Sequence, residues 1–240
     1  LAAIDGGGLR NAIPREAIAT VMVPEAQVES LSKLVKTIAE TVSAELKEVD
    51  DNVTILLSDT AIPASVMDLD SQNRLLNAIQ GCPNGVFRMS PSIKGLVQTS
   101  TNLARVVSEN GTIRMQALLR SSVDSEKEYL AETMSSVFTL AGAEVTPSGG
   151  YSGWNPDMSS PILKTMTESY EALYGQEPAV MAIHAGLECG NFLVNNPKLD
   201  MISFGPTLRD VHTPKESMHI PAVEKFWNHL VKILEMVAEK

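Results

Sequence analysis

The chain contains four histidines, and His212 is the one whose surroundings best suit a metal ligand. It follows the loop Phe204–Asp210, which leaves an apolar segment, and Thr213–Pro214 stiffens the chain behind it. A loop histidine of this kind binds a metal ion through its neutral imidazole. One histidine is not a metal site, however, and no HxxxH, HxD or CxxC spacing occurs in the chain.

His184 is the second candidate, because it ends an apolar segment that is expected to be a strand and precedes Ala185 and Gly186. In α/β proteins the carboxyl ends of parallel strands are where functional sites lie. A buried histidine that holds the following loop explains the same position equally well. His219 and His229 lie beside and inside a C-terminal helical pattern and are expected to be structural.

Composition excludes several functional classes. The 240 residues are 44% hydrophobic and 20% charged, which is ordinary for a globular protein of one or two domains. A formal net charge of −10 with no basic stripe argues against nucleic acid as a partner and against anionic membranes. No apolar run reaches the roughly 18 residues that a membrane span needs.

The two cysteines, Cys82 and Cys189, are far apart in the sequence and form no disulfide framework. A reducing compartment fits this usage, so we expect a cytoplasmic protein. The chain begins with Leu1 rather than Met, and no signal peptide opens it, so we expect an expressed fragment.

Residues 1–148 alternate predicted strands and helices. Asn110–Gly111 between two long β-branched segments is a strong hairpin signal, and Asp5–Gly8 has the composition of a turn. The pattern predicts an α+β sandwich, with helices on one face of a mostly antiparallel sheet. Strands are expected at 1–4, 17–23, 53–57, 85–89, 96–107, 112–122 and 144–146, and helices at 25–49, 68–81 and 125–140.

The composition changes at Ser148–Pro161, which is rich in glycine, serine and proline and reads as a connection. Beyond it, apolar strands alternate with helices, the pattern of a parallel α/β sheet. We therefore place a domain boundary near residue 150, with domains at 1–148 and 149–240. Strands are expected at 179–183 and 201–204, and helices at 160–174, after 186 and from 221 to 239.

Several dispersed motifs, in order along nearly the whole chain, resemble those of the Xaa-His (aminoacyl-histidine) dipeptidases, within the dinuclear zinc exopeptidase superfamily that includes the carnosinases. The motifs are Leu9–Arg15, Gln98–Asn102, Arg120–Asp124, Gly149–Trp154, Ile183–Gly190, Asp200–Arg209 and Val211–Glu216. The resemblance implies a lid domain at 1–148, truncated at its N-terminal edge, followed by the C-terminal segment of an α/β catalytic domain.

The resemblance also implies roles for single residues. His212 matches the last metal ligand of the family, and Arg120 is similar to the lid arginine that binds the substrate carboxylate, for which a guanidinium is well shaped. Without the resemblance, Arg120 would be read as an exposed strand arginine. Asn11 binds substrate or a neighbouring strand, and Gly186 matches the loop that contacts the substrate backbone. Glu188 either pairs with the substrate ammonium or complements a helix dipole.

The family's other metal ligands and its general base have no counterpart within residues 1–240 and are expected upstream of residue 1, so the catalytic residues are unknown. The family binds two metal ions, zinc or other divalent metals, which activate a water for peptide hydrolysis. Because zinc takes three or four protein ligands, we expect this chain by itself to be inactive.

The implied activity is hydrolysis of Xaa-His-type dipeptides by the complete enzyme, with a short peptide as partner and a homodimer formed through the lid as a possibility. Two alternatives stay open at this point. One is a non-catalytic module that works by association, and the other is a different branch of the superfamily, such as a tripeptidase or an amidohydrolase.

Overall fold

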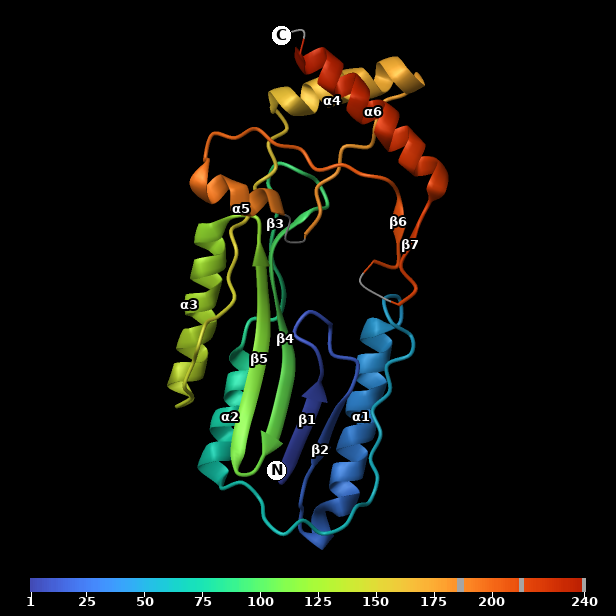
Figure 1. The fold of residues 1–240 in the computed structure, drawn as a ribbon. Coiled ribbons are helices and arrows are strands. Elements are labelled where there is room, and N and C mark those ends of the chain that lie inside the picture. Colours follow the sequence, from blue (N-terminus) through green and yellow to red (C-terminus); the bar gives the residue numbers. More distant parts are fainter. Residues whose placement is uncertain (185–187, 212–213, 239–240) are drawn as a thin grey trace. The chain divides into compact units, whose positions relative to one another are not determined.

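The structure is a computed structural model that describes residues 1–184, 188–211 and 214–238, and it divides into two compact units (Figure 1). The first unit comprises residues 1–84, 102–118 and 134–145, and the second comprises residues 85–101, 119–133 and 146–240. Two long strands and one helix run from one unit into the other. The expected domain boundary near residue 150 remains a prediction, because these units divide the chain at other places.

An antiparallel sheet of five strands forms the centre of residues 1–121, as the sequence pattern predicts. Its order is β2-β1-β4-β3, and β5 pairs with β4. Strand β1 pairs antiparallel with β2 and β4, and β3 pairs antiparallel with β4. The strands are β1 (Ala3–Gly7), β2 (Ala17–Thr20), β3 (Gly85–Met89), β4 (Val97–Glu109) and β5 (Thr112–Ser121).

The predicted hairpin between β4 and β5 is present. Asn110 and Gly111 have φ values of 50° and 73°, so both central residues of the turn are left-handed. Two positive φ values are the requirement of a tight hairpin turn whose twist matches that of its strands. Asparagine tolerates this conformation and glycine adopts it without strain, which is why the turn lies here.

The glycines that suggested a turn after Ile4 instead lie within β1. A Cβ added at Gly6 would lie 3.0 Å from the Cβ of Ala17, and one at Gly7 would lie 1.9 Å from the carbonyl oxygen of Ala104. The prediction of a turn was therefore wrong for Gly6 and Gly7. Glycine is needed here for the close approach of neighbouring strands, which composition cannot distinguish from a turn.

The predicted helices flanking the sheet are confirmed. Asp68 caps α2 through a hydrogen bond from the backbone N–H of Ser71 to its side chain. Fully buried core positions occur on both α2 and α3, among them Leu75, Ala78 and Leu130. By contrast, α1 buries none of its residues. The elements are η1 (Glu25–Gln27), α1 (Val28–Leu46), α2 (Leu69–Gly81) and α3 (Asp124–Leu140).

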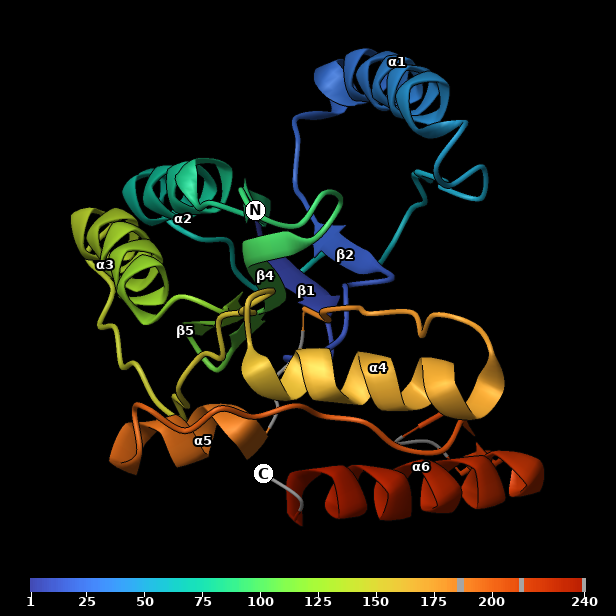
Figure 2. The ribbon, with the colours of Figure 1, turned by 90° about the horizontal axis from the view of Figure 1, so that it is seen from above.

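In the C-terminal part of the second unit, α4 and α6 lie side by side in both views (Figures 1 and 2). His229 of α6 is 7% exposed, and its Nε2 lies 2.8 Å from Oγ of Ser169 on α4. This buried hydrogen bond supports the structural interpretation of His229. The elements are α4 (Pro161–Tyr174), α5 (Glu188–Asn195), β6 (Leu208–Arg209), β7 (Ser217–Met218) and α6 (Ile220–Ala238).

Four predicted strands are wrong, because residues 53–57, 144–146, 179–183 and 201–204 are not strands. The described residues contain no parallel strand pair, so the expected parallel α/β arrangement of residues 149–240 is not seen in them. A strand exists only where a second strand pairs with its backbone. Apolar composition at these segments predicts burial, but Met181 and Ile183 remain 79% and 58% exposed.

None of the helices in the described ranges is long and apolar enough to cross a membrane.

The hairpin turn gives a test of the fold. We expect Gly111→Ala to lower the free energy of unfolding by roughly 1–2 kcal/mol, because a left-handed residue with a Cβ carries about this penalty. Urea-induced unfolding monitored by circular dichroism measures it. Gly8→Ala is the matched control, since a Cβ at Gly8 meets open space and its φ is not positive. Equal losses in both variants would contradict the turn geometry.

Candidate functional site

Arg120 lies near the end of β5 and is half-buried. The burial of β5 alternates as far as Ala117 and then stops, so both faces of the strand are covered from Leu118 to Ser121. Within the described ranges, no carboxylate forms an ion pair with Arg120. The other half-buried arginine, Arg105, pairs with Asp5. Arg120 therefore presents a partly desolvated positive charge that an anionic ligand would satisfy.

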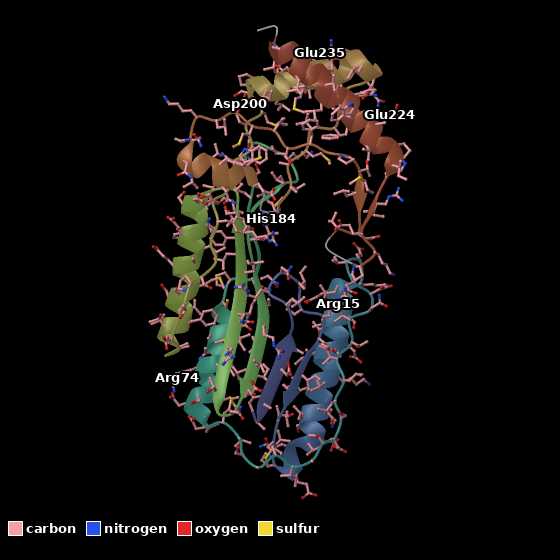
Figure 3. All side chains as sticks on the ribbon, in the orientation of Figure 1. Arg15, Arg74, His184, Asp200, Glu224 and Glu235 are labelled. Atoms are coloured by element: carbon pink, nitrogen blue, oxygen red, sulfur yellow. The ribbon has the colours of Figure 1, made fainter. Side chains whose placement is uncertain are left out.

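His184 lies in the same unit, close to the start of β4 and the end of β5 (Figure 3). Its Nε2 is 2.6 Å from Oγ of Ser100. Burial lowers the pKa of His184 below 6.5, and the positive charge of Arg120 lowers it further, while a hydrogen bond with the backbone of Val97 acts in the opposite direction. At neutral pH the imidazole beside Arg120 is therefore uncharged.

Buried polar side chains fix the start of β4 and the end of β5. Oγ1 of Thr99, whose side chain is fully buried, lies 2.8 Å from Oγ of Ser121 on β5 and donates to Glu126 of α3 at 2.6 Å. The side-chain amide of Gln98 donates to the same carboxylate oxygen at 2.9 Å. These bonds hold both strands and the first turns of α3 in one arrangement beside Arg120.

Glu126 remains ionised in this environment. Burial acts to raise its pKa, but the hydrogen bonds from Thr99 and Gln98 and the charge of Arg88 together lower it. The guanidinium Nε of Arg88 on β3 lies 3.0 Å from a carboxylate oxygen of Glu126. Since Glu126 is fully engaged by these partners, it is a structural anion and does not act as a counter-charge for Arg120.

Glu188, a predicted site residue, is exposed in the first turn of α5. The position of α5 follows from close backbone contact, because a Cβ at Gly190 would lie 2.3 Å from the carbonyl oxygen of Ser152. The next residue of that connection, Gly153, lies similarly close to Ser122, where a Cβ would be 2.5 Å from the carbonyl oxygen. The connection at 152–153 is thereby in contact with both the end of β5 and α5.

Charged groups also hold this connection. Asp124 at the start of α3 accepts hydrogen bonds from Nζ of Lys127 at 2.6 Å and from the backbone N–H of Gly153 at 2.9 Å. Lys127 also donates to the carbonyl oxygen of Tyr151. The Gly149–Trp154 motif is therefore a fixed support for α5 rather than a free linker.

Asn11 is exposed and lies in the first unit, whereas Arg120, His184 and Glu188 lie in the second. Its loop is held by Asn102, whose side-chain amide donates to the carbonyl oxygens of Arg10 at 3.2 Å and Ala12 at 2.8 Å. This contact leaves the Asn11 side chain on the surface of its loop. The structure thus supports a positioning role for Asn102 within the Gln98–Asn102 motif.

Two predicted site residues, Gly186 and His212, lie outside the described residues. Among residues 1–184, 188–211 and 214–238, no group of three or more His, Cys, Asp and Glu side chains could hold a metal ion. The described donor set by itself therefore does not fit zinc, which takes three or four protein ligands.

Sequence reasoning missed two features of this site. Ser100 was named only as part of the Gln98–Asn102 motif, without its contact to His184, and Glu126 was not named at all. A run of four short polar residues, Gln98–Thr101, at the start of a strand was the available signal, because buried polar side chains need hydrogen-bond partners. The sequence could not show that the partner of this run lies on α3.

Comparison with known proteins gives related sequences and structures. No protein-family model matches the chain. It is 39% identical over 236 residues to the cytosol non-specific dipeptidase of Escherichia coli (strain K12), covering 98% of this chain and 49% of that protein. The chain thus spans about half the length of the curated relative that it matches.

Two solved structures are similar. The crystal structure of aminoacylhistidine dipeptidase from Vibrio alginolyticus matches with a TM-score of 0.92 and 39% identity, over 98% of this chain and 48% of that chain. Aminopeptidase PepT from Bacillus cereus ATCC 10987 matches with a TM-score of 0.57 and 17% identity, over 70% of this chain and 45% of that chain. The second match indicates a shared fold alone.

The environment of His184 predicts a pH dependence of stability. Because its pKa in the folded chain is lowered from 6.5, the unfolded chain binds the proton more readily. The free energy of unfolding should therefore fall as the pH decreases below 6.5. His184→Gln removes this titration, so its stability should fall less than that of the wild type between about pH 7 and pH 5.

Urea unfolding at each pH measures the difference. His219→Gln is the control, because His219 is exposed and the variant should follow the wild type. If the wild type and His184→Gln lose the same stability on acidification, His184 is not the group responsible.

Proposed function

Because this chain is homologous over 98% of its length to about half of an aminoacylhistidine dipeptidase, we propose that it forms the lid and the C-terminal catalytic segment of a metal-dependent dipeptidase. The lid corresponds to residues 1–148 and the catalytic segment to residues 149–240. The observation that carries the proposal is Arg120, a half-buried arginine that forms no ion pair with any carboxylate in the described part of the chain. The relationship to dipeptidases favours this function over a non-catalytic association module.

Arg120 is the proposed binding site for the terminal carboxylate of the peptide. A guanidinium donates two parallel hydrogen bonds to a carboxylate, and a partly buried guanidinium does so with less competition from water. The polar contacts of Thr99 with Ser121 and Glu126 fix the strand that carries Arg120 before the ligand arrives. A carboxylate bound at a fixed position sets the distance from the C-terminus to the cleaved bond, and recognition of the ammonium group by Glu188 would also limit the other end. Xaa-His dipeptides are therefore the proposed substrate class.

Three further residues are proposed to contact the substrate. Asn11 is presented on the loop that Asn102 holds. Gly186, which lies outside the described residues, is proposed to contact the peptide backbone. Glu188, whose carboxylate is exposed in the first turn of α5, is proposed to pair with the peptide ammonium group. The general base and the remaining metal ligands are proposed to lie outside residues 1–240.

His212 is the proposed metal ligand within this chain. When bound, two divalent metal ions such as zinc would polarise the scissile carbonyl and lower the pKa of a bound water. The contribution of this chain is then to bind and orient the peptide through Arg120 and the residues at the start of α5, and to supply one imidazole. By itself the chain is proposed to be inactive.

The uncovered apolar segments support the proposal that residues 149–240 complete a larger domain. Residues 179–183 and 201–204 are apolar, and both carry exposed hydrophobic side chains, such as Met181 and Phe204. In the complete enzyme these segments are proposed to pair with strands from another part of the protein.

The exposed apolar side chains of α1 are proposed to form the homodimer contact, and the enzyme is proposed to be cytoplasmic.

The carboxylate clamp makes a direct prediction for the complete enzyme. Arg120→Ala should lower kcat/KM for an Xaa-His dipeptide about ten-fold or more, because the lost charge-assisted hydrogen bonds are worth about 1.5–3 kcal/mol. The C-terminal amide of the same dipeptide should lose far less. Steady-state kinetics with both substrates measures the two losses.

Arg114→Ala is the matched control, because Arg114 lies on the same strand but is exposed. It should leave the kinetics of both substrates unchanged. Equal losses for the acid and the amide in Arg120→Ala would mean that Arg120 supports the fold and does not bind the carboxylate.

The metal ligand makes a second prediction. In the complete enzyme, His212→Ala should remove about one metal ion per chain and nearly all turnover, while the fold is retained. A zinc ion is held by only three or four protein ligands, so the loss of one ligand weakens its binding strongly. Metal analysis after dialysis, with circular dichroism for the fold, measures this. His219→Ala should keep both metal and activity, since His219 is exposed beside β7. Normal metal content in His212→Ala would make His212 a structural residue.

A further inference from the structure

His184 connects the chain before α5 to β4. Its Nε2 lies 2.6 Å from Oγ of Ser100, and the ring also forms a hydrogen bond with the backbone of Val97. These contacts anchor the end of the segment 179–184 on the strand next to β5.

Arg120 lies close to this imidazole, because β5 pairs with β4 and the contacts of Ser122 with Gln98 (N–H to O, 3.2 Å) and of Ser121 with Thr99 (2.8 Å) place Arg120 opposite Ser100. The charge of the side chain next to a ligand-binding arginine determines whether the guanidinium can bind an anionic ligand. A carboxylate at this position would pair with the guanidinium and compete with an anionic ligand. A second cation at this position would repel the guanidinium. A neutral side chain that satisfies its own hydrogen bonds on β4 avoids both outcomes.

We infer that His184 is a positioning residue of the carboxylate subsite, which occupies the place beside Arg120 with a neutral ring bonded to Ser100 of β4 and leaves the charge of Arg120 free for the peptide carboxylate. This inference rests on the proposed function of Arg120. The inference makes the charge at position 184 decisive. Position 184 requires a neutral hydrogen-bonding side chain, and a carboxylate there abolishes the subsite.

The test compares two variants of the complete enzyme that differ in charge and hardly in shape, His184→Gln and His184→Glu. The amide of glutamine can reach Oγ of Ser100 as the imidazole does, and glutamate has the same length. We expect His184→Gln to keep the preference for an Xaa-His dipeptide over its C-terminal amide. His184→Glu should raise KM for the free acid about ten-fold or more while KM for the amide and kcat stay near those of His184→Gln, because opposite charges this close interact strongly.

A second matched pair, His184→Asn and His184→Asp, covers the case in which one variant fails to fold, as judged by thermal unfolding. If the acidic and amide variants of a folded pair have equal KM values for the free acid, the inference is overturned. It is also overturned if His184→Gln loses activity equally for both substrates, because that loss would mean a purely structural role.

The proposed function is tested by the wild-type enzyme and Arg120→Ala, assayed with the same two substrates. If the wild-type enzyme does not prefer the free acid, or if Arg120→Ala leaves that preference intact, the carboxylate subsite itself is wrong. If the wild type and Arg120→Ala behave as proposed and the acidic variants at position 184 do not, only the role of His184 fails.

Discussion

The carboxylate of Glu126 is the contact on which the arrangement around Arg120 depends. It accepts hydrogen bonds from Thr99 and Gln98 at the start of β4 and pairs with Arg88 on β3. One side chain of α3 thus joins two strands to the helix, and its two partners on β4, Gln98 and Thr99, are buried. Buried polar groups stabilise only when every member is satisfied, so loss of Glu126 would leave Thr99 and Gln98 without their partner. Thr99 also contacts Ser121 at the end of β5, so the support of the strand that carries Arg120 would be weakened at the same time.

The two half-buried arginines, Arg105 and Arg120, differ in whether the fold supplies a partner for their charge. Arg105 pairs with Asp5 and donates to the carbonyl oxygens of Gly6 and Gly7, so its donors are used within the fold. Those carbonyls are within reach because glycine allows β1 to approach β4 closely. Arg120 has a neutral imidazole for its neighbour instead. The same residue type on adjacent strands therefore has its charge paired within the fold in one case and not paired with a described carboxylate in the other, and the difference comes from the neighbouring side chains.

Local signals predicted much of the fold. The Asn110–Gly111 turn, the Asp68 cap and the apolar periodicity of the helices each act within a few residues, so the sequence alone identifies them. Strand pairing depends on residues distant in the sequence, so apolar composition predicts strands at 179–183 and 201–204 where no described partner strand pairs with them. The importance of Arg120 came from resemblance to a family. The hydrogen bond that places His184 on β4 joins it to Ser100, 84 positions away in the sequence, and periodicity does not reveal such a contact.

The exposed segment at 179–183 has a consequence for the physical behaviour of the chain in solution. It is a short stretch of apolar residues, without charge, glycine or proline, whose Met181 and Ile183 are open to water and whose backbone is not paired in a sheet. Segments of this composition are those that stack between molecules into intermolecular β-structure. Residues 1–240 produced alone would therefore self-associate as concentration rises, and the charge of −10 would oppose this association least at high ionic strength, where screening is strongest.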